Sequence, residues 1–125
     1  MMKNAINWFE IPAKKFERAK SFYEKVLDTK LETITMEDMG MTMAFFPADL
    51  ENGVGGGIAF GPGCEPADKG ALVYLNGGDD LAVPLARVKS AGGKVIVPKT
   101  SIGPHGFMAH FIDSEGNKVA FHSRN

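Results

Sequence analysis

The chain has 125 residues, of which 44% are hydrophobic and 23% charged, the composition of a globular protein of about one domain. With 14 basic and 15 acidic residues the formal net charge is -1, and no basic run exceeds Lys14-Lys15, which argues against nucleic-acid binding. No apolar stretch is long enough to span a membrane, and the N-terminal residues lack the apolar core of a signal peptide. We therefore expect a cytoplasmic protein, and the single cysteine, Cys64, agrees with a reducing compartment.

The first half of the chain predicts a strand, a helix and three further strands. Residues 5–11 are apolar nearly throughout and end at Pro12, which cannot donate to a sheet ladder. Over residues 16–27 the apolar side chains recur with the spacing of one helix face, and charged residues occupy the other face. Three short apolar segments bounded by turn residues are predicted as strands, at residues 31–36, 41–46 and 55–60.

The second half predicts the same order of elements. Pro84 suits the first turn of a short helix over residues 84–91, and Gly92-Gly93 can supply its left-handed C-terminal cap. The strands of this half are predicted at residues 71–76, 94–97, 107–112 and 118–123. The sequence thus predicts an α+β protein of one domain, residues 1–125, made of two βαβββ modules over about 5–60 and 71–123.

Two stretches resemble a known superfamily. The segment from Trp8 to Leu31, WFEIPAKKFERAKSFYEKVLDTKL, contains a helical FY pair, and the segment from Gly106 to Ser123, GFMAHFIDSEGNKVAFHS, contains a D..GN hairpin. Both resemble the vicinal oxygen chelate superfamily of glyoxalases, extradiol dioxygenases and the fosfomycin and bleomycin resistance proteins, and in particular its glyoxalase-like subgroup. The resemblance implies that the two modules form a curved mixed sheet around a cup, and that the protein is a homodimer.

The resemblance also implies where a metal would be held. In the metalloenzymes of this superfamily, the first and last strands of each module each bring one ligand to a divalent ion. The corresponding positions here are Trp8, Gly56, Leu72 and Ala120. None of them carries the oxygen or imidazole donor that such an ion needs. We therefore expect a glyoxalase-like protein that binds a small organic molecule in an apolar cup, without the standard metal ligands.

Residues two positions apart on a strand share a face, so the next position along each strand also belongs to the predicted cup. These positions are Glu10, Ile58, Tyr74 and His122. Glu10, Tyr74 and His122 are the candidate catalytic residues, because a carboxylate and an imidazole in an apolar enclosure can act as acid and base. Alternatively, Glu10 and His122 are relocated ligands for Zn, Ni, Mn or Fe in a lyase, isomerase or dioxygenase. Whether the protein is an enzyme stays open.

The remaining candidate pocket residues each have an ordinary structural interpretation beside the functional one. Trp8 can stack on a planar ligand or fill the core. His105 lies in the loop IGPHG, which is predicted to overhang the cup, and His110 lies on a strand, where histidine is often a surface group. Ile58, Leu72 and Ala120 are predicted as apolar walls. The run GVGGG at Gly53 to Gly57 is not a phosphate loop, because no glycine stands at 58 and no helix follows.

Overall fold

The computed structural model describes residues 3–125. The first half of the chain contains β1 (Trp8–Pro12), α1 (Phe16–Leu27), β2 (Glu32–Met36), the 3-10 turn η1 (Glu37–Met39), β3 (Met41–Phe45) and β4 (Gly55–Phe60). The second half contains β5 (Val73–Asn76), α2 (Ala82–Leu85), α3 (Val88–Ala91), β6 (Lys94–Ser101), the 3-10 turn η2 (Gly103–His105), β7 (Phe107–Ile112) and β8 (Lys118–Ser123). No helix within residues 3–125 is long and apolar enough to cross a membrane.

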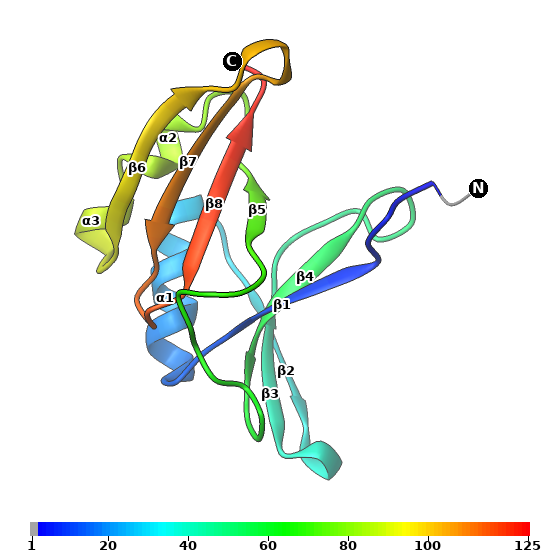
Figure 1. Cartoon of the computed structure of the whole chain (residues 1–125). Helices are drawn as coiled ribbons and strands as arrows, with labels where there is room; N and C mark the ends of the chain where they lie inside the picture. Colours follow the sequence, from blue (N-terminus) through cyan, green and yellow to red (C-terminus); the bar gives the residue numbers. More distant parts are fainter. Residues whose placement is uncertain (1–2) are drawn as a thin grey trace.

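The strands form two four-stranded sheets with the same topology. Sheet A has the order β1-β4-β3-β2 and sheet B has the order β5-β8-β7-β6. In each sheet the first pair of strands is parallel and the other two pairs are antiparallel. The predicted α+β fold with two βαβββ modules is thus confirmed. The strands β1 and β4 diverge from β5 and β8, so the two sheets point in different directions (Figure 1).

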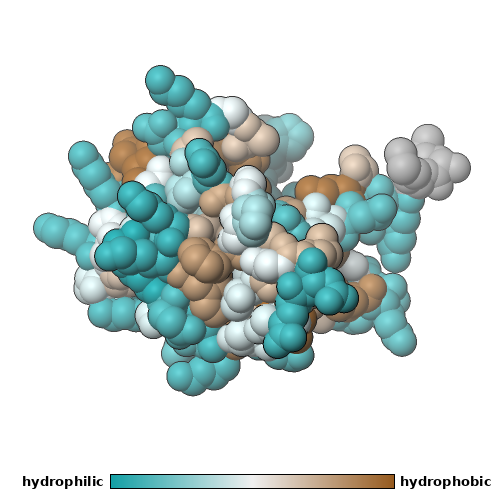
Figure 2. All heavy atoms as spheres, turned by 90° about the horizontal axis from the view of Figure 1, so that it is seen from below, coloured by the Kyte–Doolittle hydropathy of each residue, from teal (hydrophilic) through white to brown (hydrophobic). Residues whose placement is uncertain are grey.

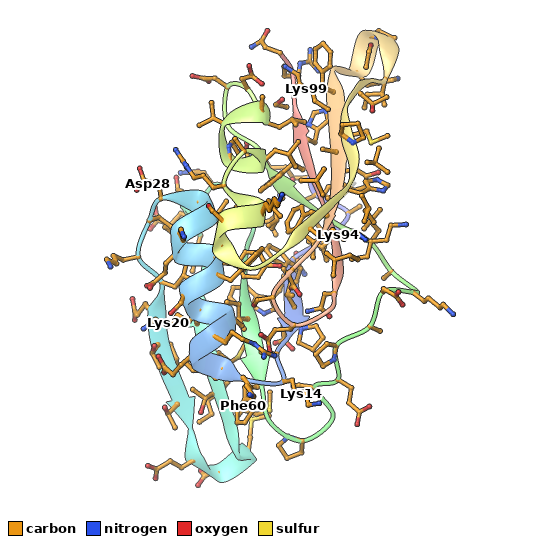
Figure 3. All side chains as sticks on the ribbon, turned by 90° about the vertical axis from the view of Figure 1, so that its left-hand side faces the viewer. Lys14, Lys20, Asp28, Phe60, Lys94 and Lys99 are labelled. Atoms are coloured by element: carbon orange, nitrogen blue, oxygen red, sulfur yellow. The ribbon has the colours of Figure 1, made fainter. Side chains whose placement is uncertain are left out.

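The helix α1 links the two modules through the hydrophobic core. Its buried face includes Phe22, Tyr23 and Val26, as the apolar spacing predicted. Phe22 packs against Phe111 of sheet B, and the same core cluster contains Ile58 of sheet A. The helices of both modules lie on one side of the molecule (Figure 3). The opposite side of each sheet is called here its helix-free face.

The predicted helix over residues 84–91 is wrong in one respect, because it consists of two separate turns, α2 and α3. At the break the amide N–H of Arg87 donates to the carbonyl of Pro84, only three residues back, at 3.0 Å. That tighter bond interrupts the regular helical ladder between the two turns. Gly92 ends α3 in the left-handed conformation, with φ 110°, as expected for a C-terminal cap.

Two strand predictions also need correction. The first strand spans Trp8–Pro12 rather than residues 5–11, and the strand predicted over 94–97 continues to Ser101 through Pro98. Both prolines lie on edge strands, since β1 and β6 each have one neighbour. At an edge the missing N–H costs no ladder bond, and Pro98 lies where the pairing of β6 with β7 shifts register.

A buried hydrogen-bond network joins the FY and D..GN motifs. The hydroxyl of Tyr23 donates to Asp113 Oδ2 at 2.7 Å, and the side-chain amide of Asn117 donates to the same oxygen at 3.0 Å. The Asn117 amide also donates to the carbonyl of Pro12 at 2.7 Å, which connects the end of β1 to the hairpin between β7 and β8. Burial and the nearby Asp113 charge raise the pKa of Tyr23 well above its usual value. These motif residues therefore hold the modules together.

The start of α1 is capped by a residue from the other module. The helix has no capping side chain of its own, and Lys14 and Lys15 donate their backbone N–H groups to Glu115 Oε1 at 2.9 and 2.7 Å. Arg18 donates from Nε to Glu115 Oε2 at 2.6 Å, and the Glu115 side chain is fully buried. Lys14 lies directly before α1, whose other end is marked by Asp28 (Figure 3). A carboxylate here also suits the positive end of the helix dipole.

Candidate functional site

The strand register of sheet A decides which side chains face the ligand site predicted for it. A Cβ on Gly56 would meet the ring of Phe9, so these two residues share a face. On that same face Ile11 pairs with Ile58, and both are core residues; Ile58 is fully buried. This corrects the expectation that Ile58 lines the cup. Gly56 likewise lies on the core face rather than on the face of Trp8.

The helix-free face of sheet A carries a small group of aromatic and acidic side chains. Glu10 pairs with Gly57, and Phe45 pairs with Gly57 from the other side. Trp8 lies edge-on to Phe45, with 5.0 Å between ring centroids, and its indole N–H donates to Glu10 Oε2 at 3.2 Å. Glu10 is exposed, so its carboxylate is available to a ligand or to a partner chain. Nothing in the sequence indicated that Phe45 belongs to this group.

Sheet B repeats this arrangement with different chemistry. Tyr74 pairs with Ala120, and His110 pairs with Ala120 from the other side. The Tyr74 hydroxyl and His110 Nε2 are 3.3 Å apart, which places a hydrogen bond across the small Ala120 side chain. Ala120 is fully buried although it lies on the helix-free face, because its two large neighbours close over it. The structure thus brings together Tyr74 and His110, a pair that the sequence pattern did not predict.

The surroundings of His110 favour its neutral form. Partial burial and, to a smaller extent, the charge of Lys118 lower the pKa of His110 below its usual value. Its Nδ1 atom is buried without a hydrogen-bond partner among the described residues. A ring with one bonded and one unpartnered nitrogen has a restricted choice of tautomer.

His122 has a fixed tautomer for a different reason. Its Nε2 lies 2.7 Å from the backbone carbonyl of His105 in η2, and a carbonyl can only accept. Nε2 therefore carries the proton, and in the neutral ring Nδ1 is left with a lone pair. The loop around His105 does reach over the end of β8, but it contributes its backbone there, while the His105 side chain is exposed.

Two cavities adjoin these residues. The smaller, of about 530 Å³, is lined by Tyr74, Asn76 and His122 together with neighbouring residues at the ends of β5 and β8, Arg124 among them. The larger, of about 930 Å³, lies between β1 and β5 and is lined by Glu10, Leu72 and Tyr74 among others. It also reaches the C-terminal end of α1, at Leu27 and Asp28, so only part of it belongs to the helix-free faces. Of these two cavities, formed by residues 3–125, Glu10 lines the larger and His122 the smaller, whereas Tyr74 lines both.

The repeat between the modules contains a one-residue shift. Glu10 and Tyr74 occupy equivalent positions 64 residues apart, but their partners Gly57 and Ala120 are 63 residues apart. The equivalent of Ala120 is therefore Gly57, not Gly56. The correction leaves the chemistry unchanged, since glycine offers no donor at either position. Within residues 3–125, no group of three or more His, Cys, Asp and Glu side chains is arranged to hold a metal ion.

Comparison with known proteins identifies the superfamily of this chain. The family model for the Glyoxalase/Bleomycin resistance protein/Dioxygenase superfamily matches residues 5–121. The chain belongs to this superfamily. A glyoxylase-like domain-containing protein from Didymella fabae is 32% identical over 132 residues, covering 99% of this chain and 97% of that protein.

Solved structures of the superfamily share the fold. A glyoxalase I mutant from Zea mays superposes with a TM-score of 0.73 at 25% identity, covering 94% of this chain. This superfamily member spans about half of that maize chain, 45% of its length. Glyoxalase I from Leishmania major superposes with a TM-score of 0.71 at 13% identity and covers 98% of this chain and 88% of its own. A fosfomycin resistance protein from Listeria monocytogenes superposes with a TM-score of 0.64 at 13% identity, covering 100% and 94%.

The residues of this superfamily member do not fit the metal that the superfamily implies. The corrected set of ligand positions is Trp8, Gly57, Leu72 and Ala120, and none carries a carboxylate, imidazole or thiolate. Beside the ligand position Ala120 in sheet B, the Tyr74 phenol and the His110 imidazole form a hydrogen bond instead. The chemistry of this site therefore cannot be derived from metal chelation at the standard positions.

Proposed function

We propose that this protein binds a small organic molecule against the helix-free faces of its sheets, as a glyoxalase-like binding protein of the cytoplasm. The observation that carries the proposal is the side-chain set at the four positions where the superfamily holds its metal. These positions lack metal donors, while Tyr74 borders two cavities of about 530 and 930 Å³. Cavities of this size accommodate metabolite-sized ligands. Trp8 and Leu72 supply apolar contacts, and His110 and His122 supply fixed polar groups.

We further propose that the complete site forms in a homodimer. Glu10 and His122 border different cavities of one chain, and β1 and β5 each have an unpaired edge. Exposed large side chains such as Met39, Leu50 and Tyr74 support association. Figure 2 shows several small hydrophobic groups among hydrophilic residues on the face seen from below. A second copy that sets its sheet A against sheet B of the first would enclose the site. Analytical ultracentrifugation at micromolar concentration should give the mass of a dimer, and a monomer mass would contradict this part of the proposal.

One observation favours an enzymatic alternative. His122 donates Nε2–H to a backbone carbonyl and keeps a lone pair on Nδ1, which is the usual arrangement of a metal-ligating histidine. In this alternative, Glu10 of one chain and His122 of another hold Zn, Ni, Mn or Fe in a lyase, isomerase or dioxygenase.

A thermal-shift series with chelator-treated protein distinguishes the organic-ligand binding protein from the metalloenzyme. If the protein is an organic-ligand binder, Zn, Ni, Mn, Fe(II) and Mg should each leave the melting temperature unchanged. A metal bound in the native state at a hundred times its Kd would add about 2.7 kcal/mol. For a chain of this length that corresponds to a rise of roughly 8 to 15 °C.

The controls are two histidine variants. His122→Ala removes the candidate ligand, whereas His105→Ala removes an exposed imidazole and keeps the carbonyl that binds His122. A saturable rise with one metal that is lost in His122→Ala and kept in His105→Ala would overturn the binding proposal in favour of the metalloenzyme.

A further inference from the structure

Tyr74 and His110 form a side-chain pair that spans the strand between them. They belong to β5 and β7, which lie on either side of β8. Next-but-one strands are about 10 Å apart, so two long side chains are needed to bridge them. The bridge passes over Ala120, and the 3.3 Å contact joins Tyr74 Oη to His110 Nε2. A larger residue at position 120 would separate the two rings.

The surroundings of His110 assign the direction of this hydrogen bond. Its Nδ1 atom is buried and has no acceptor within reach among the described residues. A proton on Nδ1 would leave a buried N–H unpaired, which proteins avoid more strictly than an unpaired lone pair. The neutral ring therefore carries its proton on Nε2 and donates it to Tyr74 Oη. The hydroxyl proton of Tyr74 is then not used by His110.

Tyr74 can direct this free proton toward the cavities that it borders. Its side chain is 51% exposed and lines both of them. Because its oxygen already accepts a hydrogen bond, the O–H is polarised and its orientation is restricted. A hydroxyl in this state recognises an acceptor oxygen on a ligand.

Charge on the same face favours an anionic acceptor. Lys118 lies two residues before Ala120 on β8, and its positive charge contributes to the lowered pKa of His110. Within residues 3–125, neither ion pair of the structure involves Lys118, so its charge is not neutralised by a neighbouring carboxylate. The smaller cavity at Tyr74 is also lined by Arg124, which adds positive charge there. The larger cavity is lined by the carboxylates Glu10 and Asp28 beside apolar residues such as Leu72, so an anionic acceptor fits the smaller cavity.

We propose that Tyr74 is a ligand-binding residue that donates its hydroxyl proton to the carboxylate of a small, otherwise apolar acid, with His110 as the positioning residue. This inference rests on the proposed function, because it names the chemical class of the molecule bound on the helix-free face of sheet B. It needs no metal.

The binding test uses three probes that share one ring system and differ in one group: naphthalene-2-carboxylate, naphthalene-2-carboxamide and 2-methylnaphthalene. Titration calorimetry of the wild-type chain should give the tightest binding for the carboxylate. Tyr74→Phe keeps the ring and removes the hydroxyl, so it should weaken carboxylate binding about tenfold or more and leave methylnaphthalene binding unchanged. Thr33→Val removes an exposed strand hydroxyl from sheet A and should change none of the three.

The positioning role of His110 has its own readout. In nitrogen-15 spectra of the free protein, the ring of His110 should show a protonated Nε2 and an unprotonated Nδ1. His110→Gln keeps a side-chain N–H donor for Tyr74 and should retain most of the carboxylate preference, whereas His110→Leu should lose it. Near-UV circular dichroism of each variant verifies that it is folded.

The outcomes distinguish failure of the carboxylate assignment from failure of the proposed function on which it rests. Equal binding of all three probes, unaffected by Tyr74→Phe, would overturn the carboxylate assignment while supporting an organic-ligand site. Failure of the carboxylate to bind the wild-type chain at millimolar concentration, or a proton on Nδ1 of His110, would also overturn it. A metal response in the thermal-shift series would instead overturn the proposed function itself.

Discussion

Replacement of Asp113 by alanine is expected to destabilise the protein by about 3 to 5 kcal/mol, the usual cost of breaking a buried polar network. Asp113 is 3% exposed and accepts hydrogen bonds from the Tyr23 hydroxyl, the Asn117 amide and two backbone N–H groups, those of Glu115 and Asn117. Without it these donors are left buried and unpaired. Chemical denaturation with a shared slope should show the loss directly, and the melting temperature should fall by on the order of 10 °C or more.

Two milder variants identify the source of the effect. Asp113→Asn keeps one acceptor oxygen for the backbone N–H groups, and Tyr23→Phe removes only the hydroxyl, so each should cost less than Asp113→Ala. In the double variant the two losses should not add, since both remove the same bond. A loss below about 1 kcal/mol for Asp113→Ala would show that this network does not hold the modules together.

Replacement of Glu115 by glutamine should have the next largest effect, about 1 to 3 kcal/mol at neutral pH. The amide can still accept from the N–H groups of Lys14 and Lys15, but it loses the charge that pairs with Arg18. The side chain is fully buried, so water does not replace the lost partner. Urea denaturation of the wild type and the variant at pH 7 measures the difference.

The effect of Glu115→Gln should depend on pH in a defined direction. Burial alone would raise the pKa of Glu115, but hydrogen bonds from Arg18, Lys15, Ser114 and Lys14 together lower it. Because the pKa in the folded state is below that of the unfolded chain, the carboxylate stabilises the protein above about pH 4.3. The stabilisation is lost as the pH falls through the folded-state pKa. The difference between wild type and variant should thus shrink at acid pH, and a difference that grows there would contradict the assignment.

The fold could be predicted from the sequence because its signals are local. The apolar spacing along α1 and the glycine and proline residues between strands set the elements, and the FY and D..GN motifs carried the resemblance. The structure adds the reason for those motifs, since Tyr23, Asp113 and Asn117 bind one another in the core. The break between α2 and α3 and the extension of β6 past Pro98 depend on tertiary context, which the pattern does not contain.

The site was less predictable because strand register decides which side chains face a ligand. The glycine run before Ile58 has no side chains whose alternation could fix that register. The choice of Gly56 as the ligand position therefore placed Ile58, two residues further on, on the wrong face. Tyr74 and His122 lie on the same face of sheet B as Ala120, and their part in a ligand site stays a prediction. The contact between Tyr74 and His110 joins residues 36 apart in sequence across a small residue, and no local pattern indicates it.

The most direct test of a ligand site without the standard metal positions is a fragment titration followed by two-dimensional amide NMR on chelator-treated, isotopically labelled protein. We expect aromatic carboxylates to shift the amide signals of Tyr74, His110, Ala120 and His122 in a saturable manner, with no metal added. Signals of α1 residues on the other side of the sheet should move little. If no fragment shifts this group of signals, or if they respond only after a divalent metal is added, the central claim is wrong.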